Sequence, residues 1–168
     1  MHKGLRNIRV LLVDDHHFMR SVWRALLDGL GFREIVDCRD SEAAFTHLRQ
    51  GKFDLIVTDY HLGDVNGAEF ARMLRAQEDP ACHLVPIIGC TADTRRAVIS
   101  DMIDSGMDEV LAKPVSARIA WSKFHAIAER RRPFVRTNVF FGPDRRRLKG
   151  GSFAGEERRD LLDLNDSN

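Results

Sequence analysis

The feature that most constrains this chain is a regular alternation of short apolar runs with longer amphipathic segments. The apolar runs cover residues 8–13, 35–36, 53–58, 85–90 and 109–112. The segments with helical spacing cover residues 18–30, 41–48, 68–76, 94–105 and 116–131. Strands that alternate with helices in this way form a parallel sheet with helices on both faces, joined by right-handed crossovers. The sequence therefore predicts a doubly wound α/β domain with five strands.

Two serines stand where helix caps are expected. Ser41, followed by Glu42, is predicted to open the second helix, and Ser116 is predicted to cap the last one. A serine at such a position accepts a hydrogen bond from a backbone N–H of the first helical turn. After Pro133 the helical pattern ends.

A polar side chain follows four of the five runs. Asp14 and Asp15 end the first run, Asp59 the third, Thr91 the fourth and Lys113 the fifth. The carboxyl ends of parallel strands meet at one edge of the sheet, and ligands bind there in folds of this class. Five side chains from positions up to 99 residues apart are therefore predicted to converge.

The chemistry of this set is coherent. Three converging carboxylates repel one another and require a cation, and oxygen ligands of this kind suit Mg²⁺. Lys113 supplies a compact positive charge for an oxyanion, and the hydroxyl of Thr91 can donate to the same anion. With Mg²⁺ present, an aspartate can attack phosphorus and form an acyl phosphate. The alternative is that these residues only cap strand ends or form ion pairs. That interpretation would suffice for a single carboxylate at a strand end, but it does not account for the whole set.

These five residues, each after a predicted strand, resemble the motif of the CheY-like receiver domains of bacterial two-component response regulators. The resemblance implies a flavodoxin-like sheet with strand order 2-1-3-4-5. It implies that Asp59 accepts phosphate from a histidine kinase, and that Asp14 and Asp15 hold Mg²⁺ together with it. Lys113 would pair with the phosphoryl group, and Thr91 would carry the switch.

Two features depart from the usual receiver pattern. The residue three before the lysine is often aromatic in receivers and couples to the threonine, whereas here it is Val110. The loop after the phosphoacceptor often carries a Met-Pro pair, whereas residues 61–63 read His-Leu-Gly. An aromatic–threonine switch is therefore not expected. His16 and His17 are interpreted as a solvated helix start rather than as part of the acidic pocket.

The sequence carries few signals for targeting or for disulfide formation. No apolar run approaches about 18 residues, and the N-terminus shows no signal pattern, so we expect a cytoplasmic protein without membrane insertion. The cysteines are odd in number and lack CxxC spacing, which favours free thiols over disulfides. They are Cys38, Cys82 and Cys90.

The net charge of +1 conceals an asymmetry. Residues 130–149 hold eight Lys or Arg and one acid, Asp144, for a charge of +7, while the rest of the chain carries −6. This asymmetry points to an anionic ligand. A merely solvated tail would not need the phenylalanines and valines found there. A nucleic-acid contact over so few residues would be weak and salt-sensitive, and is not favoured.

A guanine nucleotide explains more of this stretch. Arginine can fork onto guanine O6 and N7, pair with phosphate and stack on a purine. The lone acid, Asp144, suits the N1–H and N2–H edge of guanine. Gly142-Pro143 is predicted to form a turn that presents Asp144 together with the arginines that follow.

Residues 131–136 (RRPFVR) and 141–147 (FGPDRRR) also resemble the arginine-rich segment of the CheY-like c-di-GMP effector (Cle) group. The resemblance implies cyclic di-GMP as ligand and docking to a flagellar motor switch component, which would control motility and surface attachment. We expect the free tail to be disordered and to become ordered around the ligand. The predicted c-di-GMP-binding residues are Arg132, Arg136, Asn138, Phe141, Asp144, Arg145, Arg146 and Arg147.

We therefore predict a receiver domain over residues 6–131, an arginine-rich ligand-binding segment over 132–149 and a flexible C-terminus over 150–168. The tail is too short for a DNA-binding domain with its own core. We expect a signalling adaptor rather than an enzyme. The alternative is a phosphorelay receiver controlled by phosphorylation of Asp59, with the tail as a polybasic accessory. A small nucleic-acid-associated regulator is the third candidate.

Overall fold

A computed structural model describes residues 4–144 of the chain and confirms the predicted sheet. Five parallel strands lie in the order β2-β1-β3-β4-β5. Each predicted strand is present, with its bounds shifted by at most a few residues. The strands are β1 (Arg9–Val13), β2 (Glu34–Cys38), β3 (Leu55–Asp59), β4 (Ile87–Thr91) and β5 (Glu109–Ala112).

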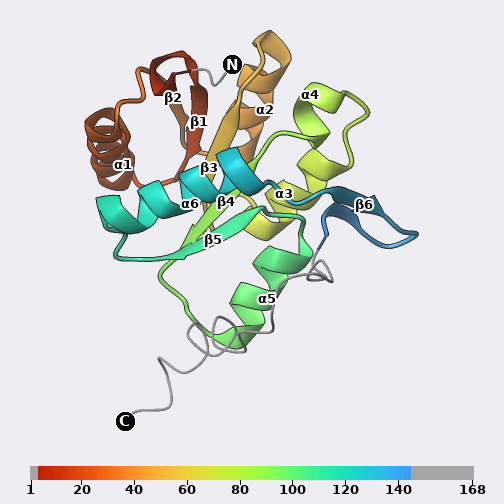
Figure 1. Cartoon of the computed structure of the whole chain (residues 1–168). Coiled ribbons are helices and arrows are strands. Elements are labelled where there is room, and N and C mark those ends of the chain that lie inside the picture. The colour runs from red at the N-terminus through yellow and green to blue at the C-terminus, as the bar shows by residue number, and fades with distance from the viewer. Residues whose placement is uncertain (1–3, 145–168) are drawn as a thin grey trace.

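Helices cover both faces of this sheet (Figure 1). One face carries α1 (His17–Leu30) and α6 (Ala117–Arg130), and the other carries α2 (Ser41–Gln50), α3 (Gly67–Arg75) and α5 (Arg96–Asp104). A single turn of 3₁₀ helix at Leu5–Asn7 and the short α4 (Pro80–His83) were not predicted. None of the helices within residues 4–144 is long and apolar enough to cross a bilayer.

The core lies in two layers, one on each side of the sheet. In β1, Val10 and Leu12 pack toward α1 and α6, whereas Leu11 and Val13 pack toward α2, α3 and α5. Every residue of β3 and β4 is buried. This is the pattern of a parallel sheet that is covered on both faces, and it leaves only the strand ends open to ligands.

One of the two predicted serine caps is confirmed. Ser116 caps α6 by accepting the N–H of Ile119 at 3.3 Å, as expected. The cap of α2 is Asp40, whose carboxylate accepts the N–H of Ala43 at 2.8 Å, and Ser41 is the first helical residue. The Ser41 hydroxyl instead donates to Asp64 at 2.5 Å. An aspartate directly before a serine is an equally good cap, so the sequence alone could not separate them.

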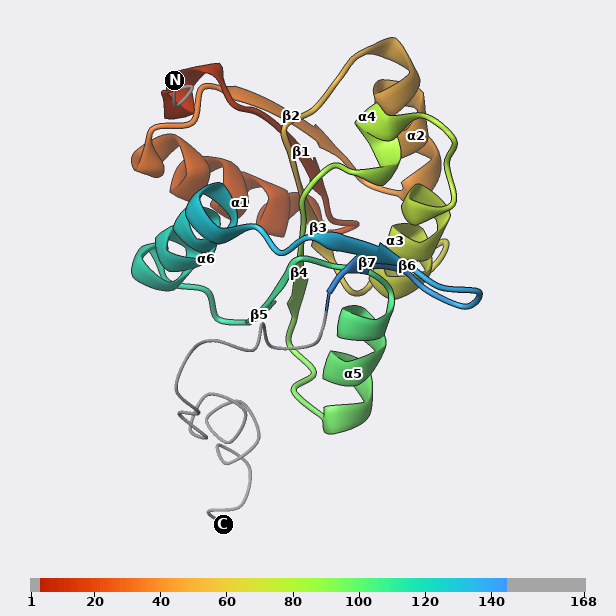
Figure 2. The same ribbon diagram turned by 45° about the vertical axis from the view of Figure 1, so that its right-hand side comes forward.

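The prediction of a disordered free tail is wrong for the stretch that follows α6. There, β6 (Phe134–Arg136) and β7 (Phe141–Pro143) form an antiparallel hairpin that lies beside α3 and α5 (Figure 2). The predicted turn is also misplaced, because Gly142 and Pro143 belong to β7. The chain turns at residues 137–140, where the Thr137 N–H donates to the Phe140 carbonyl at 2.8 Å. Arg145, Arg146, Arg147 and the predicted flexible C-terminus lie outside the described residues.

Candidate functional site

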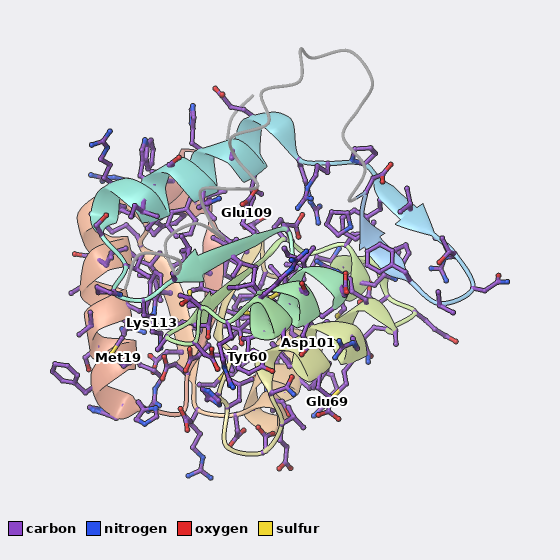
Figure 3. All side chains as sticks on the ribbon, turned by 90° about the horizontal axis from the view of Figure 1, so that it is seen from below. Met19, Tyr60, Glu69, Asp101, Glu109 and Lys113 are labelled. Atoms are coloured by element: carbon purple, nitrogen blue, oxygen red, sulfur yellow. The ribbon has the colours of Figure 1, made fainter. Side chains whose placement is uncertain are left out.

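The sheet brings the predicted charged residues together at the carboxyl ends of its strands. Asp14 follows β1, Asp59 ends β3 and Lys113 follows β5; Lys113 is labelled in Figure 3. The Lys113 ammonium lies 2.9 Å from an oxygen of Asp59 and 3.4 Å from an oxygen of Asp14. Both carboxylates are buried, Asp14 fully so. The predicted convergence over 99 residues of sequence is thus confirmed for these three side chains.

The electrostatics of this cluster follow from burial and pairing. Burial raises the pKa of Asp14, against the lowering effects of the His16 backbone N–H and of Lys113. For Lys113, burial alone would lower the pKa, but the hydrogen bond to Asp59 and the two carboxylate charges outweigh it, so the pKa is raised. The lysine is therefore held as a cation between two acids. A second cation would offset the remaining excess of negative charge.

Thr91 ends β4 and is fully buried. Its hydroxyl accepts the N–H of Asp93 at 2.9 Å, and its carbonyl accepts the N–H of Lys113 at 2.8 Å. The threonine thus joins the β4–α5 loop to the residue that carries the ammonium group. Thr91 lies on β4, the strand that pairs with β3, which Asp59 ends.

The start of α3 packs directly onto the backbone of Asp59. A Cβ atom at Gly67 would lie 2.3 Å from the Asp59 carbonyl oxygen, so only glycine permits this approach. The Gly67 N–H donates to the carbonyl of Tyr60 at 2.6 Å. This contact fixes the chain that follows Asp59. The sequence analysis did not single out Gly67, although it begins a helix directly after the loop.

Asp15 has a neighbour that the sequence analysis set aside. The ring of His16 places its Nδ1 atom 2.6 Å from an oxygen of Asp15 and 3.9 Å from one of Asp14. His16 does stand at the start of α1 with an exposed side chain, as predicted, but the ring belongs to the acidic pocket. Within residues 4–144, the set of side chains close enough to share a metal ion is Asp14, Asp15 and His16. This donor set fits a divalent cation.

A model of the response regulator receiver domain matches residues 10–120. The chain belongs to the receiver family. Chemotaxis protein CheY-3 of Vibrio cholerae serotype O1 is 32% identical over 125 residues, which are 74% of this chain and 95% of that protein. Chemotaxis protein CheY of Pseudomonas aeruginosa is 32% identical over 123 residues, which are 73% and 98% of the two chains.

Solved structures agree with this assignment. The receiver domain of the sensor histidine kinase PA1611 from Pseudomonas aeruginosa, determined with a magnesium ion in its active-site cleft, is 29% identical and has a TM-score of 0.62. It covers 74% of this chain and 96% of its own length. The response regulator CheY4 of Vibrio cholerae matches with a TM-score of 0.64 over 71% of this chain and 98% of its own, and at 23% identity it supports the fold alone.

The chain is thus a CheY-like receiver of two-component signalling. Receiver domains bind Mg²⁺ in the active site, as the PA1611 receiver does. They are typically signalling adaptors rather than enzymes.

The hairpin is attached to the receiver through a buried network that the sequence analysis missed. Asp108, just before β5, accepts hydrogen bonds from Arg75 at 3.0 Å and from Arg131 at 3.1 Å. The guanidinium of Arg132 donates to the Asp108 backbone carbonyl. Asp108 and Arg75 are both buried. The partners are up to 33 residues apart and belong to different elements, so no local sequence pattern predicts the network.

Aromatic contacts complete the attachment of the hairpin. The Phe134 ring lies beneath the guanidinium groups of Arg75 and Arg131, at 5.0 and 4.7 Å from ring centre to Cζ. Phe141 packs against Phe134 at 5.3 Å, and the guanidinium of Arg136 lies 4.4 Å from the centre of the Phe141 ring. Guanidinium groups placed over phenylalanine rings thus form one side of the hairpin.

The predicted c-di-GMP-binding residues that the structure describes lie at different places on this hairpin. Arg132 stands at its base and is half-buried, Arg136 and Asn138 are exposed toward the turn, and Phe141 is half-buried in β7. The Asp144 N–H donates to the Pro133 carbonyl at 2.7 Å, which closes the base. Pro133 and Asp144, 11 residues apart in sequence, therefore meet at the base of the hairpin.

Proposed function

We propose that this receiver is a cytoplasmic adaptor that binds cyclic di-GMP through residues 132–147 and docks to a flagellar motor component to control motility and surface attachment. The observation that carries the proposal is the arginine–phenylalanine hairpin. It presents an exposed guanidinium, Arg136, already stacked on a ring. A planar cation of this kind is preorganised to receive a purine or a phosphate.

Charge and connectivity support the same ligand. The hairpin belongs to a stretch with a charge of +7 on an otherwise acidic chain. The hydrogen bond that closes the hairpin base sets Asp144 beside Pro133, the residue after Arg132. Asp144 is the acid that would accept hydrogen bonds from guanine. A guanine base could then be bounded by an acid and an arginine, with phosphates on the neighbouring arginines. Arg145, Arg146 and Arg147 would supply further phosphate contacts.

The receiver also offers a surface for a protein partner next to this segment. A groove of about 230 Å³ lies between α5, β5 and α6 and is lined mainly by apolar side chains. Ile99, Ile103 and Val110 line it, and Arg132 stands at its edge. A ligand that engages Arg132 would alter the rim of this groove. The relatives named as chemotaxis proteins support a motor component as the partner.

Calorimetry on the full-length protein tests the nucleotide. We expect c-di-GMP to bind in the micromolar range or tighter, and GTP and a mixed-sequence RNA to bind more weakly. Arg136→Ala should lower the affinity for c-di-GMP about tenfold, since a charge-assisted hydrogen bond and a stacking surface are lost together. Asp144→Ala should lower it selectively for guanine ligands.

Arg118→Ala is the matched control, because Arg118 is exposed on α6 and its loss removes the same charge. Its effect on affinity should stay within about twofold. An equal loss in Arg118→Ala and Arg136→Ala would mean that only net charge matters. If the wild-type protein binds no c-di-GMP, or if Asp144→Ala binds it unchanged, the nucleotide proposal or its guanine-edge contact is wrong.

The alternative function is control by phosphorylation of Asp59, and the geometry of the acidic cluster favours it independently. Asp59 would accept phosphate from a histidine kinase, Asp14 and Asp15 would hold Mg²⁺ with it, and Lys113 would pair with the phosphoryl group. Incubation with acetyl phosphate and Mg²⁺ should add one phosphoryl group by intact mass, and none in Asp59→Asn. No labelling of the wild type would leave nucleotide binding as the sole input.

A further inference from the structure

The acidic pocket contains an imidazole in addition to its carboxylates. His16 Nδ1 lies 2.6 Å from Asp15 Oδ1 and 3.9 Å from Asp14 Oδ1. Potential ligand atoms of these three residues all lie within 4.8 Å of one another. The Lys113 ammonium engages Asp59 at 2.9 Å and Asp14 at 3.4 Å. The His16 ring nitrogen is the potential metal ligand that is grouped with Asp14 and Asp15.

The backbone holds this ring at the pocket. The His16 N–H donates to Asp14 Oδ1 at 2.9 Å, so the residue is tied to the buried carboxylate through its main chain. His16 is the N-cap residue of α1, but its side chain makes no capping hydrogen bond. The ring is 68% exposed and is free to adjust without disturbing the core. In the pocket, the His16 side chain therefore interacts with Asp15.

The chemistry of an added imidazole differs from that of a third carboxylate. Mg²⁺ prefers oxygen donors and retains several waters. Imidazole favours first-row transition ions, whose affinity for a mixed nitrogen and oxygen site rises along the series from Mn²⁺ to Cu²⁺. At 2.6 Å, Nδ1 must carry a hydrogen that it donates to Asp15. The other neutral tautomer places that hydrogen on Nε2, which leaves the Nδ1 lone pair available to an ion.

We propose that His16 is a nitrogen ligand of the divalent-ion site, and that this receiver consequently selects transition ions such as Mn²⁺ over Mg²⁺. Asp14 and Asp15 supply oxygen donors and His16 supplies Nδ1. The selectivity comes from His16, so its loss leaves a carboxylate site of the ordinary Mg²⁺ type. This inference concerns the acidic pocket alone and does not depend on nucleotide binding by the hairpin.

A competing role for His16 is to position Asp15 through the hydrogen bond without touching the ion. That role predicts an equal loss of affinity for every divalent ion when the ring is removed, because each of them uses Asp15. A direct nitrogen ligand predicts a much larger loss for Mn²⁺ than for Mg²⁺. A direct ligand also couples the nuclear spin of its nitrogen to the unpaired electrons of Mn²⁺.

The experiment compares His16→Ala with His17→Ala in the full-length protein. His17 is the adjacent histidine and begins α1 with an exposed side chain, so it is a matched control. Binding of Mn²⁺ is followed by its electron paramagnetic resonance signal, and binding of Mg²⁺ by competition. We expect His16→Ala to weaken Mn²⁺ about tenfold or more and Mg²⁺ by less than about twofold. His17→Ala should change neither.

Electron spin-echo envelope modulation of bound Mn²⁺ gives a second readout. Nitrogen modulation should be present in the wild type and in His17→Ala, and absent in His16→Ala. Thermal unfolding confirms that all three proteins are folded. The proposal is overturned if the wild type binds neither ion, if it shows no nitrogen modulation, if Mn²⁺ and Mg²⁺ weaken by the same factor in His16→Ala, or if His17→Ala behaves like His16→Ala.

Discussion

Asp108 joins the receiver to the hairpin, and we predict that Asp108→Ala is strongly destabilising. The residue is 4% exposed and accepts three hydrogen bonds with its carboxylate. The donors are the Ile87 N–H at 3.0 Å, Arg75 at 3.0 Å and Arg131 at 3.1 Å. One side chain therefore holds the start of β4, the end of α3 and the segment after α6.

The expected magnitude follows from what Asp108 would leave behind. The Arg75 side chain is 3% exposed, and burial lowers its pKa to about 10 although Asp108 opposes the shift. Without the carboxylate, the buried guanidinium would keep only uncharged partners, the Phe134 ring and carbonyls such as those of Gly106 and Val85. Removing one partner of a buried ion pair costs about 3–5 kcal/mol of unfolding free energy. That is a large share of the total stability of a domain, which is about 5–15 kcal/mol.

Urea denaturation of the full-length chain, followed by circular dichroism, measures this loss. Glu109→Ala is the control, because Glu109 is the next residue and its pair with Lys123 is partly exposed. The control should lose at most about 1 kcal/mol. Asp108→Asn, which keeps one acceptor oxygen, should fall between the two and remains measurable if Asp108→Ala does not fold. If both Asp108 variants lose no more than Glu109→Ala, the network does not hold the fold together.

Two further predictions concern the surroundings of the acidic site. Gly67→Ala should cost about 1–3 kcal/mol, because its Cβ would lie 2.3 Å from the Asp59 carbonyl. Gly29→Ala, with no atom within 4 Å, should be neutral or stabilise by up to about 1 kcal/mol, so thermal unfolding should move the two in opposite directions. Burial alone would raise the pKa of Asp64, but hydrogen bonds from Ser41 outweigh it and hold the pKa below 3.8. The stability that these bonds give is present above pH 3.8 and is lost as the pH falls through the lowered pKa, so the deficit of Ser41→Ala relative to wild type should shrink in acid.

The sheet and its acidic edge could be predicted because they depend on local patterns and on topology. Apolar runs of strand length recur, and Asp14, Asp59 and Lys113 each stand just after one of them. Once the strands are parallel, their carboxyl ends must meet. No contact between distant residues had to be guessed in order to place these side chains.

The hairpin could not be predicted for the opposite reason. Its strands are three residues long, and their pairing is held by contacts with Arg75 and Asp108 rather than by their own periodicity. Gly142 and Pro143 are the residues that usually mark a turn, yet here Gly142 is required because a Cβ would lie 2.8 Å from the Cα of Gly106. The turn is built by the Thr137 hydroxyl, a weaker signal.

The contact between the His16 ring and Asp15 was not predicted, because it depends on the path of the backbone and not on the residue type. A histidine at the start of a helix is normally solvated, and this one is largely exposed. Its backbone N–H, however, is bound to Asp14, and this bond turns the ring toward Asp15. The pairing of two adjacent aspartates with a following histidine is the sequence signal that could have indicated it.

The strand β5 lies between the acidic cluster and the network that anchors the hairpin. Asp108 stands at its amino end and Lys113 just past its carboxyl end, five residues of extended chain apart, or about 17 Å. Substitutions more than about 7–10 Å apart without shared partners usually have additive effects on stability. We therefore expect the two ends to vary independently over evolution: a lineage could lose Asp59 and keep the hairpin, or exchange the hairpin and keep the acidic site.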